Sequence, residues 1–186
     1  MAQLQSVKLG AFEVIQSELI VSDPCHTPDI WCVGIISNAK PGIWEAEICL
    51  YKQGSRDETV ACLAVFHQQC PPKGYLTIRE ELFWVGVDSG QAGVFDKLFY
   101  RAGTGSGQAL GQEAQEAWYQ QCCRQTLSRA AGVIPHGAVS SSGHGDGFYS
   151  CYTCRTRETK DTYTTWGVII DFDVTSQDTI RKLLLQ

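Results

Sequence analysis

Short apolar runs that end at turn residues follow one another through the first half of the chain. They are rich in Val, Ile and aromatic residues, end at clusters of Gly, Pro, Asp or Ser, and span residues 18–21, 30–37, 43–51, 59–67 and 81–87. This spacing is typical of β-rich proteins. Within the third run, every second residue from Trp44 to Leu50 is apolar, with Glu45 and Glu47 between them. That alternation indicates a half-buried strand and favours an antiparallel sheet.

One main helix is predicted, at residues 112–130. This segment contains no Gly or Pro; its acidic residues lie toward its start and its arginines toward its end, as the helix dipole favours. Two more strands are expected at residues 148–157 and 164–172, and a short terminal helix at residues 176–185. The predicted fold is a single β-rich α+β domain over residues 1–186, a mostly antiparallel sheet or sandwich with the helix packed on it.

Charge and hydropathy exclude several classes of protein. The chain has 15 Lys and Arg against 20 Asp and Glu, a formal net charge of −5, which argues against a nucleic-acid partner. No signal peptide is visible, and no apolar run approaches the roughly 20 residues needed to span a bilayer. We therefore expect a soluble, cytoplasmic protein without a membrane partner.

Nine cysteines are too few for a disulfide scaffold in a chain of 186 residues. Cys151 and Cys154 have the C-x-x-C spacing of a structural zinc site, but such a site needs a second pair of ligands and no other C-x-x-C is present. The two cysteines also lie in an expected strand, where residues three apart point to opposite faces and cannot bind one ion. We expect reduced thiols, most of them buried as small core residues: Cys32, Cys49, Cys62, Cys122, Cys151 and Cys154.

The segment at residues 86–93 contains Asp88, Ser89 and Gln91 between glycines. Asp-Ser-Gly also occurs in the nucleophile loop of serine proteases, but neither His26 nor His67 has the setting of a triad histidine. The simpler interpretation is a turn in which Asp88 and Ser89 accept backbone N–H bonds.

Two other glycine-rich segments are candidates for ligand binding. Residues 103–107 precede the helix as a phosphate cradle would, although the spacing fits neither standard phosphate-binding motif, and a flexible connector is favoured. Residues 140–149 combine serines with His144, Asp146 and Tyr149; Asp146-Gly147 is also a strong tight-turn dipeptide. If the segment is functional, His144 is its natural general acid or base.

Carboxylates could together bind a hard cation such as Mg²⁺ or Ca²⁺ if the strands that carry them are neighbours. The candidates are Asp88, Asp146 and Asp171. No EF-hand spacing supports such a site, so a solvated edge or a turn network is favoured.

Four motifs in order resemble a bacterial family of unknown function, the domain-of-unknown-function family numbered 4241. They are Ser22-Asp-Pro24, Gly86-Val-Asp-Ser-Gly90 with Phe95-Asp96, Ser142-Gly-His-Gly-Asp-Gly-Phe-Tyr149 and Val168-Ile-Ile-Asp-Phe172. The resemblance spans residues 22–172. It implies no reaction, but it implies that the Asp88 and Asp146 segments belong to one shared site.

The expected function is a non-catalytic binding or interaction role. The partner would be a protein or a small polar ligand, an immunity or phage–host conflict role would fit, and the sequence requires no cofactor. The polar site would contain Asp88, Ser89, Gln91, Ser142, His144, Asp146 and Tyr149. One alternative is a metal-assisted hydrolase with Asp88, Asp146 and Asp171 as ligands and His144 as acid or base. A second is a binder of a small anionic or nucleotide-like ligand.

Overall fold

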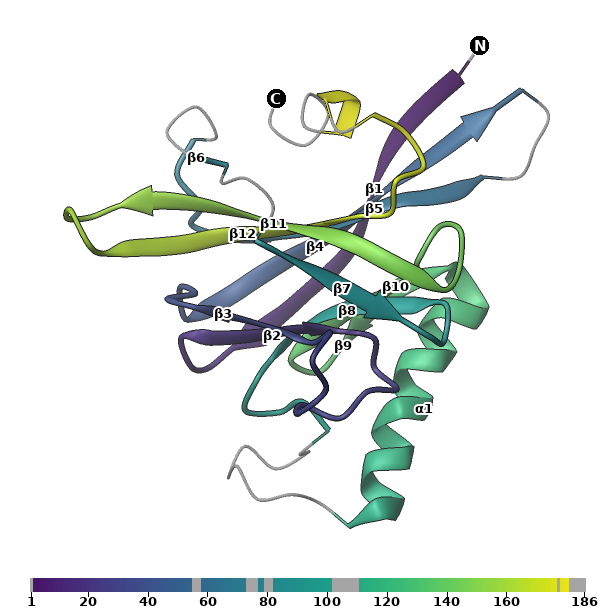
Figure 1. The fold of residues 1–186 in the computed structure, drawn as a ribbon, viewed down its shortest axis with the longest axis horizontal. Coiled ribbons are helices and arrows are strands. Elements are labelled where there is room, and N and C mark those ends of the chain that lie inside the picture. The colour runs from purple at the N-terminus through teal and green to yellow at the C-terminus, as the bar shows by residue number, and fades with distance from the viewer. Residues whose placement is uncertain are drawn as a thin grey trace.

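Two antiparallel sheets and one helix form three stacked layers in the computed structural model (Figure 1). The structure describes residues 2–54, 58–72, 77–78, 82–101, 111–176 and 178–180. Within these residues, no helix is both long enough and apolar enough to cross a membrane. The β-rich α+β prediction is confirmed.

The larger sheet, sheet A, has the strand order β1-β4-β5-β12-β11-β6, and β7 also pairs with β11. Its pairings are antiparallel, and β-bulges interrupt the register of three of them. Its strands are β1 (Ala2–Val14), β4 (Gly42–Gln53), β5 (Thr59–His67), β6 (Thr77–Ile78), β7 (Phe83–Val87), β11 (Gly147–Arg157) and β12 (Tyr163–Asp171).

The smaller sheet, sheet B, has the order β3-β2-β8-β10-β9 and is also antiparallel. Its strands are β2 (Glu18–Ser22), β3 (Gly34–Ser37), β8 (Gln91–Asp96), β9 (Ala131–Ile134) and β10 (Gly137–Ser141). The strands β7 and β8 are consecutive in the chain but lie in different sheets, so the turn at residues 88–90 crosses from one sheet to the other.

The main core lies between the two sheets. Alternate residues of each strand point into it, such as Trp44, Leu63 and Ile170 from sheet A and Leu19 and Val94 from sheet B. The opposite face of sheet A carries a second cluster, which contains Cys49, Cys62 and Ile169 together with Ile180 of the C-terminal segment. Both faces of sheet A are therefore covered, which explains why β5 is buried along almost its whole length.

The helix α1 (Gln112–Arg129) packs on the outer face of sheet B. Figure 1 shows it beside β8, β9 and β10. Its Trp118 and Cys122 join Phe95, Tyr100 and Val139 in a third apolar cluster. Trp118 lies edge-on to the rings of both Phe95 and Tyr100, at centroid distances of 5.2 and 5.1 Å.

Several boundaries differ from the prediction. The run at residues 30–37 is a strand only from Gly34, because residues 23–33 form a loop. Strands β1, β8, β9 and β10 were not predicted, since β1 is rich in polar residues and the others in Ala and Gly. The glycine-rich segment at residues 103–107 and most of the expected terminal helix lie outside the described residues.

Candidate functional site

The 86–93 and 140–149 segments, whose residues the sequence predicts as one polar site, lie side by side. Strands β7 and β11 pair in register from Cys151 with Phe83 to Gly147 with Val87. Asp88 and Asp146 each adjoin that last pair, and the backbone N–H of Ser142 donates to the carbonyl of Gly90 at 3.0 Å. Gly90 has φ of +70°, a conformation that glycine adopts without strain.

Asp23 joins a third segment to these two. One carboxylate oxygen accepts the backbone N–H groups of Asp88 at 2.9 Å and Ser89 at 2.7 Å. The other accepts the backbone N–H of Cys25 at 2.8 Å and the Ser89 hydroxyl at 2.7 Å. Because a carboxylate offers about four acceptor sites, this fully buried group has its hydrogen-bonding capacity filled.

Two residues that follow β8 bind backbone carbonyls of the loop that carries Asp23. The Tyr100 hydroxyl lies 2.8 Å from the His26 carbonyl and 3.1 Å from the Asp23 carbonyl. The Arg101 guanidinium donates to the Pro24 carbonyl at 2.7 Å. Burial raises the pKa of Tyr100, so its hydroxyl stays protonated as these contacts require. The loop is therefore anchored at several backbone positions.

His26 connects Asp88 to Cys32. Its Nε2 lies 2.9 Å from a carboxylate oxygen of Asp88, and its Nδ1 lies 3.6 Å from the Cys32 sulfur. The His26 ring therefore lies between the Asp88 carboxylate and the Cys32 thiol and contacts both. Cys32 reaches this position because it lies over Gly86, where a Cβ atom would approach the Cys32 Cβ to 2.7 Å.

The chain Asp88–His26–Cys32 has the connectivity of a nucleophilic triad, but its exposure is reversed. In such a triad the nucleophile faces the substrate and the carboxylate is buried behind the histidine. Here the Asp88 side chain is 79% exposed and Cys32 is buried. Burial also raises the pKa of the Cys32 thiol, which disfavours the thiolate. The arrangement fits a structural role, in which these contacts hold the loop at residues 23–33 against the end of β7.

Residues of helix α1 extend the hydrogen-bond network of the site. The Thr126 hydroxyl donates to the Gln91 side-chain carbonyl at 2.9 Å, and the Gln91 amide lies 3.5 Å from the Cys123 sulfur. Tyr119 of α1 also lies beside Ser89, and burial is the main cause that raises its pKa to about 12. The polar network therefore continues from the loop through the turn at residues 88–90 into the helix.

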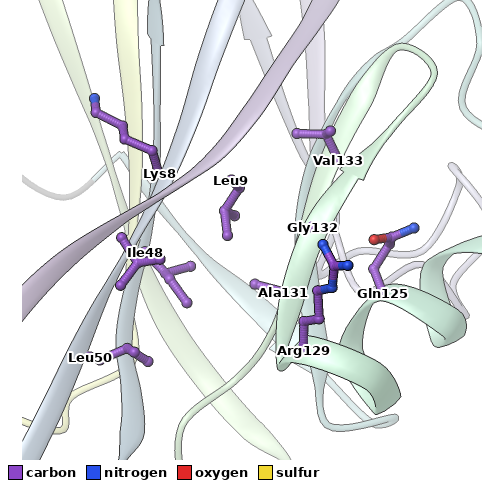
Figure 2. Close-up of a pocket in the computed structure, with 10 residues that line it drawn as sticks. Lys8, Leu9, Ile48, Leu50, Gln125, Arg129, Ala131, Gly132 and Val133 are labelled. Carbon is purple, nitrogen blue, oxygen red and sulfur yellow. The ribbon is translucent and has the colours of Figure 1, made fainter.

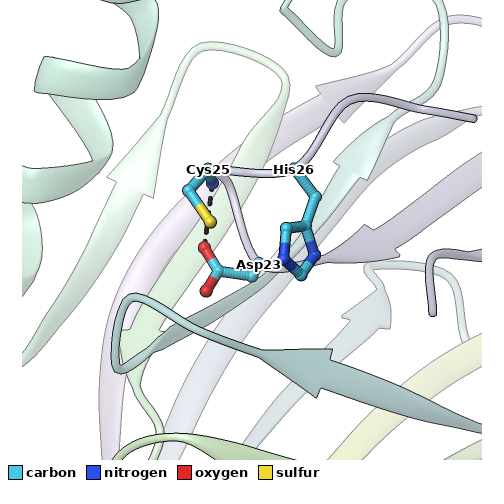
Figure 3. A group of neighbouring side chains, drawn as sticks. All are labelled: Asp23, Cys25 and His26. Atoms are coloured by element: carbon cyan, nitrogen blue, oxygen red, sulfur yellow. Dashed lines mark hydrogen bonds between the residues drawn. The ribbon is translucent and has the colours of Figure 1, made fainter. Parts of the chain in front are cut away.

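Asp23, Cys25 and His26 are close enough to consider as metal ligands. Their potential ligand atoms lie within 4.8 Å of one another, and Figure 3 shows the three side chains on one loop. The chemistry does not favour an ion, however, because both Asp23 oxygens already accept hydrogen bonds from Cys25, Asp88 and Ser89. Burial, followed by the contact with Asp23, raises the pKa of Cys25 to about 12, so its sulfur stays protonated.

The predicted site residues divide into buried anchors and exposed groups. Gln91, Ser142 and Tyr149 are buried; the Ser142 and Tyr149 hydroxyls both donate to the Gly145 carbonyl, at 2.7 and 2.8 Å. Asp88, His144 and Asp146 are exposed. Ser89 is half-buried, and its hydroxyl donates to the Asp23 carboxylate, which also accepts backbone N–H groups, so this contact fits a structural hydrogen bond.

Asp171 lies apart from Asp88 and Asp146. It pairs with Ser150 and with Cys62 in sheet A, is buried, and accepts the backbone N–H of Asp173 at 3.0 Å. Within the described ranges, only the loop group around Asp23 brings three candidate metal ligands together. The three-aspartate cation site is therefore not assembled.

An exposed aromatic surface adjoins the exposed aspartates. Trp31 is 82% exposed and its ring lies 5.5 Å from that of Phe148, which is 54% exposed. Trp84, 60% exposed, lies on β7 opposite Ser150 and on the same face as Phe148. We call these three aromatic residues, with Asp88 and Asp146, the recognition face.

Sequence reasoning missed the residues that organise the site. In the sequence, Asp23 stands out only within the Ser-Asp-Pro motif and His26 has no triad setting, so neither is predicted as a site residue. Trp31 lies in a segment expected to be a strand, so its exposure on a loop was not foreseen. The available signal was the adjacency of Asp23, Cys25 and His26, three potential ligands within four residues.

Comparison with known proteins gives no match to a family model, to a curated protein or to a solved structure. The resemblance to the family numbered 4241 therefore stays a prediction.

Proposed function

We propose that this chain is a non-catalytic binding protein that recognises a basic surface of another protein through the recognition face. The observation that carries the proposal is the pair of exposed rings in contact, Trp31 and Phe148, beside the exposed carboxylate of Asp88. Contiguous exposed apolar surface is typical of interaction sites. Tryptophan is also enriched among the residues that contribute most to protein–protein affinity.

The charge around the rings favours a partner rich in Arg and Lys. Asp29, Asp88 and Asp146 are exposed near or on the recognition face, and the whole chain carries a net charge of −5. An arginine can stack on an indole ring and at the same time pair with a carboxylate. Opposite charge on the two partners also speeds their encounter.

The hydrogen-bond network beneath the recognition face supports binding more than catalysis. Asp23 fixes the backbone at Asp88 and Ser89, and Tyr100 and Arg101 fix the loop that leads to Trp31. A surface that is already ordered loses less conformational entropy when a partner covers it.

The setting that we propose is a reducing cytoplasm. All nine cysteines are free thiols, and six of them are buried as the sequence predicted. An immunity role, in which a small acidic protein covers a basic effector, fits such a surface.

A displayed library of random peptides tests the proposal, because it supplies partners without requiring the natural one. We expect the selected peptides to carry Arg or Lys next to apolar residues. Their affinity for Trp31→Ala should fall by about tenfold or more, as for a central interface aromatic. Leu127→Ala is the matched control, because Leu127 is an 88% exposed apolar residue on α1, outside the recognition face.

The proposal fails if the selected peptides bind Trp31→Ala as tightly as the wild type, or if no peptide is enriched over the background. Peptides that lose affinity for Leu127→Ala instead would place the binding surface on the helix. Selection of acidic peptides would contradict the proposed charge of the partner.

A further inference from the structure

A cavity of about 370 Å³ lies at the edge of the sandwich remote from the recognition face. It is bounded by β1 and β4 of sheet A and by β9 and the end of α1 on the sheet B side. Strands β1 and β9 are edge strands of their sheets, whereas β7 and β11 lie toward the other edge of sheet A. The volume is within the usual range for small-molecule sites, about 300–1,000 Å³.

We propose that this cavity binds an amphipathic carboxylate, a molecule with an apolar chain and one carboxylate at its end. This ligand class is independent of the protein partner proposed above. The argument rests on the distribution of apolar and cationic side chains around the cavity.

One wall of the cavity is apolar. Val7 and Leu9 of β1 and Ile48 and Leu50 of β4 line it, and Val133 of β9 lies opposite. In Figure 2 the side chains of Leu9, Ile48, Leu50 and Val133 lie around the space between the strands and the helix. Val7, Leu9, Leu50 and Val133 are only partly buried, although they pack against the main core. An apolar chain in the cavity would remove more of their surface from water.

The helix side of the cavity supplies the polar groups. Figure 2 shows the guanidinium of Arg129 and the amide of Gln125 beside the start of β9. Gln125 comes close to this strand because Gly132 has no side chain; a Cβ there would lie 2.2 Å from the Gln125 Oε1. Two donor groups at one end of an apolar cavity are the arrangement that a carboxylate requires.

Arg129 is the cation available to a ligand. Ion pairs within the described part of the chain involve Lys8, His26, Lys52 and Lys97 on the cationic side. Lys8 also lines the cavity, but it pairs with Glu47 at 3.3 Å, and Figure 2 shows its amine directed away from Arg129. The ligand carboxylate would therefore pair with Arg129, while its chain lies toward Leu9 and Leu50.

Calorimetric titration with octanoate, below its micelle concentration, tests the site directly. We expect saturable binding at one site, and about tenfold weaker binding to Arg129→Gln because the charge-assisted contact is lost. Arg124→Gln is the matched control: Arg124 is also an exposed arginine of α1, but it does not line the cavity. Octanol should bind the wild type no more tightly than octanoate binds Arg129→Gln.

Methyl NMR locates the ligand independently of the affinity change. Octanoate should shift the methyl resonances of Leu9, Leu50 and Val133 and leave those of Val94, buried between the sheets, unchanged. The proposal is overturned if octanoate does not saturate the protein, if both arginine variants weaken binding equally, or if the shifted methyl groups lie elsewhere. None of these outcomes bears on peptide binding at Trp31, so the two proposals fail separately.

Discussion

Asp23 and Asp88 are the same residue type in one site, yet their surroundings differ completely. Asp23 is fully buried and accepts four hydrogen bonds, one of them from the backbone of Asp88. Asp88 exposes 79% of its side chain and contacts His26. A buried carboxylate with its capacity filled holds the backbone in place, while an exposed one keeps most of its capacity for a partner. The site therefore consists of an inner scaffold and an outer surface.

Among changes at this site, the largest effect should come from Asp23→Asn. The amide leaves one acceptor oxygen and turns an NH₂ group toward donors, so buried N–H groups of the network lose their partner. We expect the free energy of unfolding to fall by about 2–4 kcal/mol. Urea unfolding followed by tryptophan fluorescence measures it.

Asp146→Asn is the control for this change, because Asp146 is an exposed aspartate in the turn that precedes β11. It should alter stability by less than about 0.5 kcal/mol. If Asp23→Asn were equally mild, the inner scaffold would not depend on the carboxylate, and the distinction between the two aspartates would be lost.

Gly86→Ala tests how the loop is seated on β7. A Cβ atom at this position would lie 2.7 Å from the Cys32 Cβ and 2.8 Å from its sulfur, neither of which is the free end of a flexible chain. We expect a loss of about 1–3 kcal/mol, as for overpacking of a core. Gly111→Ala, where no atom lies within 4 Å, is the control and should leave stability unchanged in the same denaturation assay.

A loss with Gly86→Ala should also change the Trp31 environment, since Cys32 is the next residue. Fluorescence quenching by acrylamide of the native protein reports this change. Equal stability of the two glycine variants would mean that the loop moves away from β7 at little cost.

The strands of the main core were predictable because they are short apolar runs that end at turn residues, and the residues of β4 also alternate. The runs at residues 43–51, 59–67 and 164–172 became β4, β5 and β12. The six cysteines expected to be buried are buried, although Cys32 lies on the loop at residues 23–33, where a strand was expected. Cys151 and Cys154 belong to clusters on opposite faces of sheet A, as the strand period requires. These features depend on local pattern and on the tendency of small apolar side chains to be buried.

The organisation of the site was only partly predictable. Turn chemistry indicated that the Asp88 and Asp146 segments matter, and the pairing of β7 with β11 brings them together. The role of Asp23 depends on contacts with residues 65 and 66 positions later in the chain. No local pattern encodes such contacts, and the same holds for the reach of Tyr100 and Thr126 into the network.

Cys25 gives a smaller, pH-dependent test of the inner scaffold. Burial and the neighbouring Asp23 raise its pKa from 9.0 to about 12. Because the folded state favours the thiol, this contribution to stability is fully present below pH 9.0 and is lost as the pH rises toward 12. The stability of the wild type relative to Cys25→Ala should therefore decline over this range when both are unfolded in urea with reductant.

The same measurement on the Asp23→Asn background sharpens the result. Removing the carboxylate charge removes part of the cause of the raised pKa, so the decline should become smaller. A difference between wild type and Cys25→Ala that does not change with pH would contradict the assigned environment of the thiol.

The smallest effect on the free energy of unfolding should come from Trp31→Ala. A change this small would distinguish the outer surface from the inner scaffold. Trp31 is 82% exposed and contacts Phe148, so its loss removes little buried surface. We expect a change within about 0.5 kcal/mol in urea unfolding, against about 3–5 kcal/mol for Trp118→Ala, which removes a buried side chain.

A Trp31→Ala variant that unfolds as readily as Trp118→Ala would make Trp31 a structural residue, and the peptide-binding test would then need Trp84→Ala in its place. A stable variant that no longer binds the selected peptides would show that its exposure serves recognition, because no folding requirement would explain it.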